Sequence, residues 1–189
     1  MELLIEKNYD GAINKLKTFN WQKVINIIPN LEDLNDAQWR FLKGFIIEIA
    51  TEKSSNNELT YVALPHKDFD WPSENLTVEL KSLTSKNFYK KDGQLKPNFS
   101  IKLNNSNGTN NKTTLSEDNV SDILVIVGQD GVFCVKKNTV LKNAIKTGDG
   151  FLLKLNKFDL ISVTCQLKAT TTKTLDFRKI ITDAICQHL

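Results

Sequence analysis

The chain has 189 residues, of which 40% are hydrophobic and 25% are charged, and its formal net charge is +3. This composition is typical of one soluble globular domain and not of a disordered chain. No apolar run approaches the roughly 20 residues of a membrane-spanning helix, and the acidic start at Met1-Glu2 differs from a secretory signal peptide. Three widely spaced cysteines, Cys134, Cys165 and Cys186, predict reduced, buried thiols, so we expect a cytoplasmic protein with no membrane partner.

The N-terminal third of the sequence has helical periodicity. Apolar residues recur at helical spacing over 13–28, where Pro29 ends the pattern, and again over 39–49 after a cap at Asn35 or Asp36. A closing helix is expected over 177–187, with its apolar residues facing inward: Ile180, Ile181, Ala184 and Ile185.

Between these helical segments the pattern is that of strands, and a short helix is expected over 139–146. Strands are expected over 59–65, 76–81, 123–127, 132–135, 151–155 and 160–167. We therefore predict a single α/β (α+β) domain with a mixed central β-sheet flanked by helices. Its parts would be a helical region at 1–53, which is also a candidate for dimerisation, a sheet core at 58–167 and a C-terminal helix region at 168–189.

Positive charge is concentrated in one segment. Residues 81–112 contain seven lysines against one acid, Asp92, so the remainder of the chain is net negative. Such a segment suits a face that binds a polyanion, although a lysine-rich solvated loop would have the same composition. With a threonine-rich run at 170–174, it supplies the candidate DNA contacts: Lys86, Lys90, Lys91, Lys96, Lys102 and Lys173.

Candidate catalytic residues lie between 66 and 81. Glu79 and Lys81 are two apart on a predicted strand, so both side chains leave the same face, while Leu80 faces the core. Asp70 lies nine residues before Glu79, across a turn at 72–75, and a hairpin of this length brings the two carboxylates together. Asp68 shares the strand face of Asp70, so the spacing does not decide between them; we prefer Asp70 because it lies closer to the turn.

Two carboxylates and a main-chain carbonyl are the hard oxygen ligands that Mg²⁺ prefers. A lysine beside them can position the water that attacks a phosphodiester, and the ion offsets the negative charge that develops. The alternative is structural: Glu79 and Lys81 would form an ion pair on a solvated sheet face, and Asp68 and Asp70 would be ordinary turn residues.

The arrangement resembles the PD-(D/E)xK nuclease superfamily, and within it the small type II restriction endonucleases. The resemblance rests on Asp70 (or Asp68) followed by Glu79-Leu80-Lys81-Ser82, and it covers roughly residues 36–135. It departs from the pattern in one respect, because Lys67 and Phe69, and not proline, precede the two candidate aspartates.

The resemblance implies a Mg²⁺ ion held by Asp70 (or Asp68), Glu79 and the Leu80 carbonyl, with Lys81 positioning or activating water. It also implies a glutamate from the N-terminal helix, for which Glu48 is preferred to Glu52 because it lies in an apolar stretch.

The implied function is sequence-specific cleavage of double-stranded DNA that leaves 5′-phosphate and 3′-hydroxyl ends. The implied partners are DNA, a second copy of the chain, and a cognate DNA methyltransferase encoded nearby. Two alternatives stay open: a repair or recombination nuclease of the same fold, and a non-catalytic DNA-binding protein.

Overall fold

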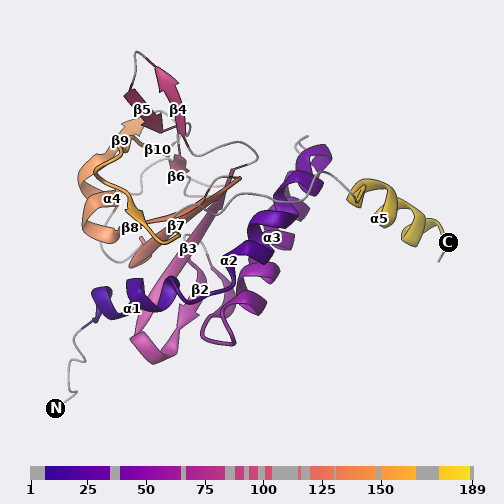
Figure 1. Cartoon of the computed structure of the whole chain (residues 1–189), viewed down its shortest axis with the longest axis horizontal. Helices are drawn as coiled ribbons and strands as arrows, with labels where there is room; N and C mark the ends of the chain where they lie inside the picture. The colour runs from indigo at the N-terminus through magenta and orange to yellow at the C-terminus, as the bar shows by residue number, and fades with distance from the viewer. Residues whose placement is uncertain are drawn as a thin grey trace.

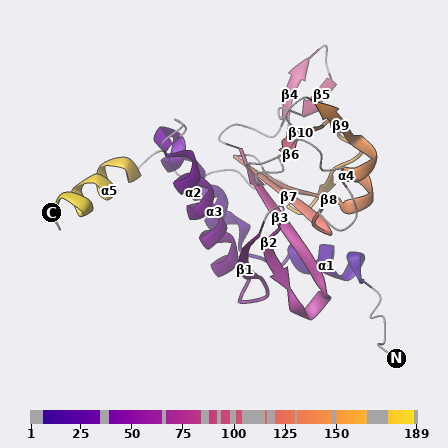
Figure 2. The same cartoon turned by 180° about the vertical axis from the view of Figure 1, so that it is seen from behind.

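A mixed six-stranded sheet lies at the centre of the computed structural model, with strand order β1-β2-β3-β7-β8-β11 and helices beside it (Figure 1, Figure 2). The structure describes residues 7–34, 39–64, 67–83, 88–91, 94–97, 101–103, 115, 120–129, 131–147, 150–164 and 175–187. The predicted α/β class with a mixed central sheet is confirmed.

The elements follow the chain in a helical part, a sheet part and a last helix. The first part holds α1 (Tyr9–Leu16), α2 (Trp21–Ile27), the 3-10 helix η1 (Ile28–Leu34) and α3 (Arg40–Ser54). The central sheet is formed by β1 (Thr60–Leu64), β2 (Lys67–Trp71), β3 (Leu76–Ser82), β7 (Ile123–Gly128), β8 (Gly131–Lys136) and β11 (Ile161–Ser162), with the 3-10 turn η2 (Pro72–Glu74) between β2 and β3. Two small sheets pair β4 (Phe88–Lys91) with β5 (Gln94–Pro97), and β10 (Gly150–Leu153) with β6 (Ile101–Leu103) and β9 (Ala144–Thr147). The remaining helices are α4 (Lys137–Asn143) and α5 (Phe177–Cys186).

The first predicted helix is divided into two. The Asn8 side chain caps α1 by accepting the Gly11 N–H at 2.9 Å, so helix formation begins before residue 13. At the break, the Trp21 indole N–H donates to the Leu16 carbonyl at 2.6 Å, which satisfies a backbone acceptor at the end of α1. The α-helix α2 ends at Ile27, just before Pro29 as predicted, and the chain continues as the 3-10 helix η1, in which Pro29 is the second residue and its missing N–H costs nothing.

The central sheet is mixed because β3 pairs differently on its two sides. It is antiparallel to β2 and parallel to β7. The turn between β2 and β3 ends at Asn75, which adopts a left-handed conformation with φ of 53° that asparagine tolerates. This tight connection fixes the register of the β2–β3 hairpin.

Two hydrophobic clusters occupy the two faces of this sheet. The larger cluster contains Val78, Leu80 and Val125 and packs against residues of α1, α2 and α3. The smaller cluster contains Leu124 and Ile126, together with Val140 of α4 and Leu153 of β10. Because β7 is buried along its whole length, its sequence is a continuous apolar run.

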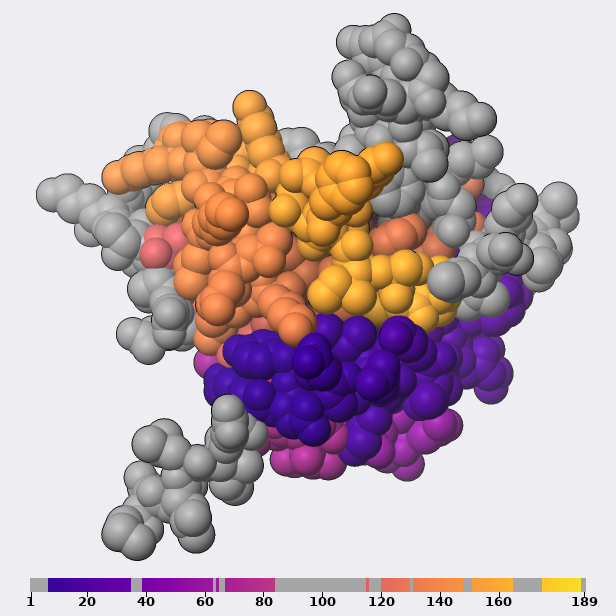
Figure 3. Space-filling model, turned by 60° about the vertical axis from the view of Figure 1, so that its left-hand side comes forward, coloured from indigo at the N-terminus to yellow at the C-terminus, as the bar shows by residue number. Residues whose placement is uncertain are grey.

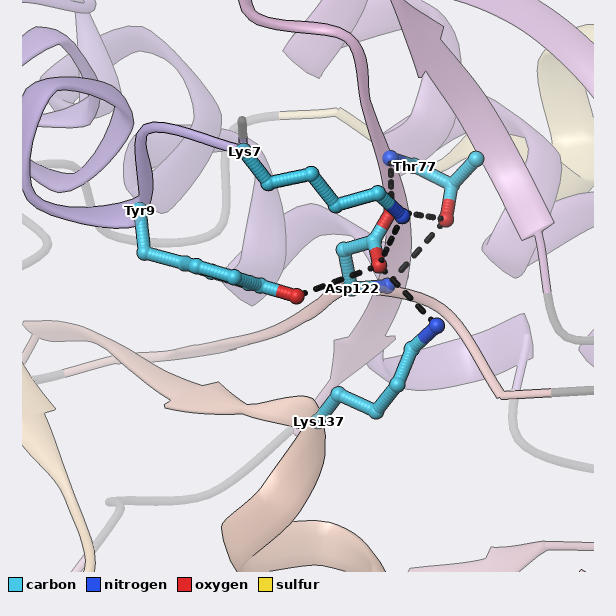
Figure 4. Close-up of polar contacts among 5 residues, drawn as sticks. All are labelled: Lys7, Tyr9, Thr77, Asp122 and Lys137. Carbon is cyan, nitrogen blue, oxygen red and sulfur yellow. Dashed lines mark hydrogen bonds and ion pairs between the residues drawn. The ribbon is translucent and has the colours of Figure 1, made fainter. Parts of the chain in front are cut away.

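A buried carboxylate ties the N-terminal segment to the sheet (Figure 4). The Asp122 side chain, 2% exposed, accepts from the ammonium groups of Lys7 at 2.7 Å and Lys137 at 2.9 Å. It also accepts from the Tyr9 hydroxyl at 3.3 Å and from both the backbone N–H and the hydroxyl of Thr77, at 3.0 and 3.1 Å. The starts of β3, β7 and α4 are therefore held to one another and to the N-terminal segment. Figure 3 shows the indigo N-terminal helices directly against the orange segment that contains β7, β8 and α4.

Helix α5 departs from its sequence prediction. Its apolar residues do not face inward: Ile180 is 49% and Ile185 54% exposed, and the helix extends away from the sheet beyond α2 and α3 (Figure 1, Figure 2). The residue two positions before α5 is anchored to η1, because the Leu175 N–H donates a hydrogen bond to the Asn30 side chain at 2.8 Å. Cys186 on this helix is exposed, which corrects the expectation of buried thiols, whereas Cys134 is buried as expected and Cys165 lies outside the described residues.

Three other elements refine the sequence prediction. The helix expected over 139–146 runs over 137–143 and gives way to β9, and the strand expected over 160–167 is described only as β11.

Among the described residues, none of the helices combines the length and the apolar character needed to cross a bilayer.

Candidate functional site

The β2–β3 hairpin brings Asp68, and not Asp70, next to Glu79. The paired residues are Phe69 with Val78 and Asp70 with Thr77, so continuing the register by one residue places Asp68 across from Glu79. The Asp68 carboxylate accepts the backbone N–H of Leu80 at 2.5 Å, which fixes it against β3.

Glu79 and Lys81 project from one face of β3, as predicted. Their partners in the parallel register are Leu124 and Ile126, both of the smaller cluster, whereas Leu80 belongs to the larger cluster on the opposite face. Glu79 is only 3% exposed, and its carboxylate is 2.5 Å from the Lys81 ammonium. The Lys81 side chain is 36% exposed. A buried acid is thus paired with a lysine that still reaches solvent.

Helix α3 contributes Glu48 to the same group. Its negative charge acts on the pKa of both Asp68 and Lys81, and its carboxylate is hydrogen-bonded by the Tyr61 hydroxyl of β1. Glu52 faces a different partner, because it accepts the backbone N–H of Tyr61 at 3.0 Å. Of the two glutamates that the sequence leaves open, Glu48 is the one that reaches the site. Tyr61 was not predicted, since nothing distinguishes it from other aromatic strand residues.

The electrostatics of the site follow from burial and crowding. Burial raises the pKa of Asp68 to about 6; the Leu80 N–H and the charge of Lys81 oppose the shift, while Glu48 and Glu79 add to it. Burial raises the pKa of Glu48 as well. For Lys81, burial alone would lower the pKa, but the charges of Glu79, Asp68 and Glu48 outweigh it, and the net shift is upward. Three acidic side chains therefore act on one lysine, and the charge of Lys81 can offset only one of them when all three are ionised.

Asp70 lies outside this group. It is exposed, is paired with Thr77, and lines a shallow pocket that also includes Lys7 and Asp122. The preference for Asp70 drawn from the sequence is therefore not supported by the geometry, and Asp68 takes its place in the candidate site. The reason is the hairpin register: the residue nearer the turn is paired with Thr77, two positions before Glu79.

The predicted DNA-contacting lysines are distributed over the small strands. Lys90 and Lys91 lie on β4, Lys96 on β5 and Lys102 on β6, while Lys86 and Lys173 lie outside the described residues. Their role as DNA contacts stays a prediction.

Within the parts of the chain that the structure describes, no group of three or more histidine, cysteine, aspartate or glutamate side chains is arranged to hold a metal ion. The candidate ligand set is smaller, with two carboxylates and a backbone carbonyl. No protein-family model, no curated protein and no solved structure matches the chain.

Replacing Asp68 by asparagine tests the electrostatics of the metal-free site. Because the folded-state pKa of about 6 lies above the usual 3.8, ionisation of Asp68 costs stability as the pH rises from about 4 through 6. Asparagine keeps an acceptor for the Leu80 N–H but cannot ionise, so Asp68→Asn is expected to raise the melting temperature at pH 7.5 in EDTA. The gain should vanish near pH 4, as followed by thermal unfolding across this range. A variant that is less stable than the wild type at both pH values would contradict this assignment.

Proposed function

We propose that this chain is a Mg²⁺-dependent DNA endonuclease with a fold like that of the restriction endonucleases. The supporting observation is the convergence of Glu48, Asp68, Glu79 and Lys81 from α3, β2 and β3. These are the residue types of a PD-(D/E)xK site, and they come together although Asp68 and Glu79 are separated by a turn and Glu48 lies on a helix.

The donor set fits Mg²⁺. Asp68 and Glu79 would hold the ion together with the Leu80 main-chain carbonyl, and water and a substrate phosphate would fill the other positions. Leu80 and Asp68 are already linked, because the Leu80 N–H is bonded to the Asp68 carboxylate on the neighbouring strand. When bound, the ion would offset the negative charge that builds up on the phosphate oxygens.

Lys81 would position the attacking water. With its pKa raised, the side chain is an ammonium at neutral pH, so it donates hydrogen bonds and does not accept the proton of water. One of its donors is directed at Glu79, and the exposed part of the side chain leaves others for water or for a phosphate oxygen. Its contribution would be orientation and charge stabilisation, with the proton passing to another acceptor. In-line attack would leave a 5′-phosphate and a 3′-hydroxyl.

The finer proposal is a type II restriction enzyme. One such site cuts one strand, so cleavage of both strands at a symmetric sequence calls for a two-fold homodimer. A cognate DNA methyltransferase encoded nearby would protect the host sequence. Discrete fragments from plasmid DNA would distinguish this function from that of a repair or recombination nuclease, which would not cut at fixed sequences.

A non-catalytic DNA-binding protein is the second candidate. The observation that favours it is that both carboxylates already have partners within the protein: Glu79 is paired with Lys81, and Asp68 accepts the Leu80 N–H. Such a protein would shift DNA on a gel with or without Mg²⁺ and would leave it uncut.

Substitution of Lys81 by methionine tests the proposed chemistry. Methionine keeps the apolar stem and removes the ammonium, so the rate of Mg²⁺-dependent cleavage is expected to fall by about 10²–10³-fold, while DNA affinity in EDTA changes little. Lys136→Met is the matched control, because Lys136 is also a strand lysine in an ion pair, with Asp10 at 2.9 Å. Cleavage that survives in Lys81→Met, or that falls equally in Lys136→Met, would remove Lys81 from the mechanism.

A further inference from the structure

Two phenylalanines on α3 are exposed beside the candidate site. Phe41 is 74% and Phe45 is 45% exposed. They lie seven and three residues before Glu48, so helical geometry places all three on one side of α3. We call Phe41 and Phe45 the aromatic ridge.

Guanidinium groups gather at the same end of α3. The sequence contains two arginines, and both stack on aromatic rings here. The Arg40 guanidinium lies 5.3 Å from the centre of the Phe41 ring, and that of Arg178, from α5, lies 5.4 Å from the Trp39 ring. Trp39 is partly buried against the larger cluster, and Arg178 shares its surface with Asp33, Asp176 and Asp183. The exposed pair is Arg40 and Phe41, and a positive charge beside an exposed ring is complementary to nucleic acid, which offers phosphates and base faces together.

The ridge is physically connected to the carboxylates. The Phe45 and Tyr61 rings pack edge to face with their centroids 5.9 Å apart, and the Tyr61 hydroxyl is hydrogen-bonded to Glu48. From Phe41 to Glu48 the helix axis rises by about 10 Å, which is about three stacked nucleotides of one strand. A strand that runs along α3 with its phosphate at the site would therefore have bases within reach of Phe41.

We propose that the aromatic ridge stacks on unpaired bases beside the phosphodiester that the site cleaves. The position of the cleaved bond rests on the proposed nuclease function; the stacking itself does not. The preferred DNA would be one in which the bases next to that bond are already unstacked, because intact duplex must first be distorted. Phe41 would be the main stacking residue, since it presents the more exposed ring of the two.

Binding without cleavage tests this directly. Fluorescently labelled duplexes, identical except for a central three-base bulge, are titrated with the protein in EDTA and followed by anisotropy. The wild type is expected to bind the bulged duplex more tightly than the paired one. Phe41→Leu should lower affinity for the bulged duplex by about tenfold, the loss of one base–aromatic stack, and leave affinity for the paired duplex nearly unchanged. Phe41→Trp should retain the preference.

Phe158 provides a matched control, because it is another exposed phenylalanine, at 85%, with a cation over its ring, from Lys157 at 4.8 Å. Phe158→Leu should keep the preference for bulged DNA. The inference is overturned if the wild type binds both duplexes equally, if Phe41→Leu keeps the full preference, or if Phe158→Leu loses as much. It is equally overturned if Phe41→Leu instead changes the oligomeric state in sedimentation, since the ridge would then be a subunit contact. Cleavage is measured separately, so loss of the preference in Phe41→Leu upholds the ridge even if Mg²⁺ supports no cleavage.

Discussion

Asp68→Asn is expected to lower the rate of Mg²⁺-dependent DNA cleavage by about 10²–10³-fold, while Asp70→Asn leaves it within about twofold of the wild type. The two aspartates lie on the same face of β2, two residues apart. Only Asp68 is bonded to the Leu80 N–H and interacts electrostatically with Glu48, Glu79 and Lys81. The asparagine side chain would keep that hydrogen bond but lose the charge that an ion needs.

The pair of variants is a controlled experiment, because each removes one carboxylate from the same strand and neither changes side-chain volume. Initial rates on supercoiled plasmid, with circular dichroism to verify folding, give the comparison. If Asp70→Asn abolished cleavage and Asp68→Asn did not, the preference for Asp70 drawn from the sequence would be restored. The hairpin register would then not determine which aspartate acts in the site.

Asp122→Asn is expected to lower the free energy of unfolding by about 3 kcal/mol at pH 7. The Asp122 carboxylate is 2% exposed and accepts hydrogen bonds from two ammonium groups, so the neutral amide removes a buried negative charge that Lys7 and Lys137 share. Chemical denaturation measures the change. Asp10→Asn is the control, because it breaks an ion pair with Lys136 in which Asp10 is 87% exposed, and its effect should be far smaller.

The same contacts set the acid dependence of stability. Burial by itself would raise the pKa of Asp122, but hydrogen bonds from Lys7, Lys137 and the Thr77 N–H outweigh it and lower the pKa to about 2. A depressed carboxylate pKa contributes stability that is complete above the usual value near 3.8 and is lost as the pH falls through about 2. The difference between wild type and Asp122→Asn should therefore shrink below about pH 4. A difference that stays constant from neutral pH down to the acid range would mean that the ionised carboxylate contributes nothing.

The sequence alone predicts that Glu79 and Lys81 share one face of a strand, because strand alternation is a local property. Asp68 was within reach too: counting outward from a turn at 72–75 pairs Asp70 with Thr77, whereas proximity to the turn was the wrong criterion. The exposure of α5 was not predictable in this way. Its amphipathic pattern is the same whether the apolar side meets the protein's own core or faces outward, and only the tertiary structure distinguishes the two.

The contacts of Asp122 show a second limit of sequence reasoning. Its partner Lys7 lies 115 residues away, and no local pattern connects a lysine before the first helix to an acid at the start of β7. Likewise the apolar neighbours of Glu48 favour it over Glu52, but the approach of Glu48 to Asp68 and Lys81 depends on how α3 packs on the sheet.

The most direct test of the proposed function is incubation of the purified protein with supercoiled plasmid DNA in the presence of Mg²⁺ or of EDTA. Nicked or linear products are expected only with Mg²⁺, and none with Glu79→Gln. Wild-type protein that leaves the plasmid intact in Mg²⁺, or that cuts it equally in EDTA, would contradict the assignment of Asp68, Glu79 and Lys81 as a metal-dependent nuclease site.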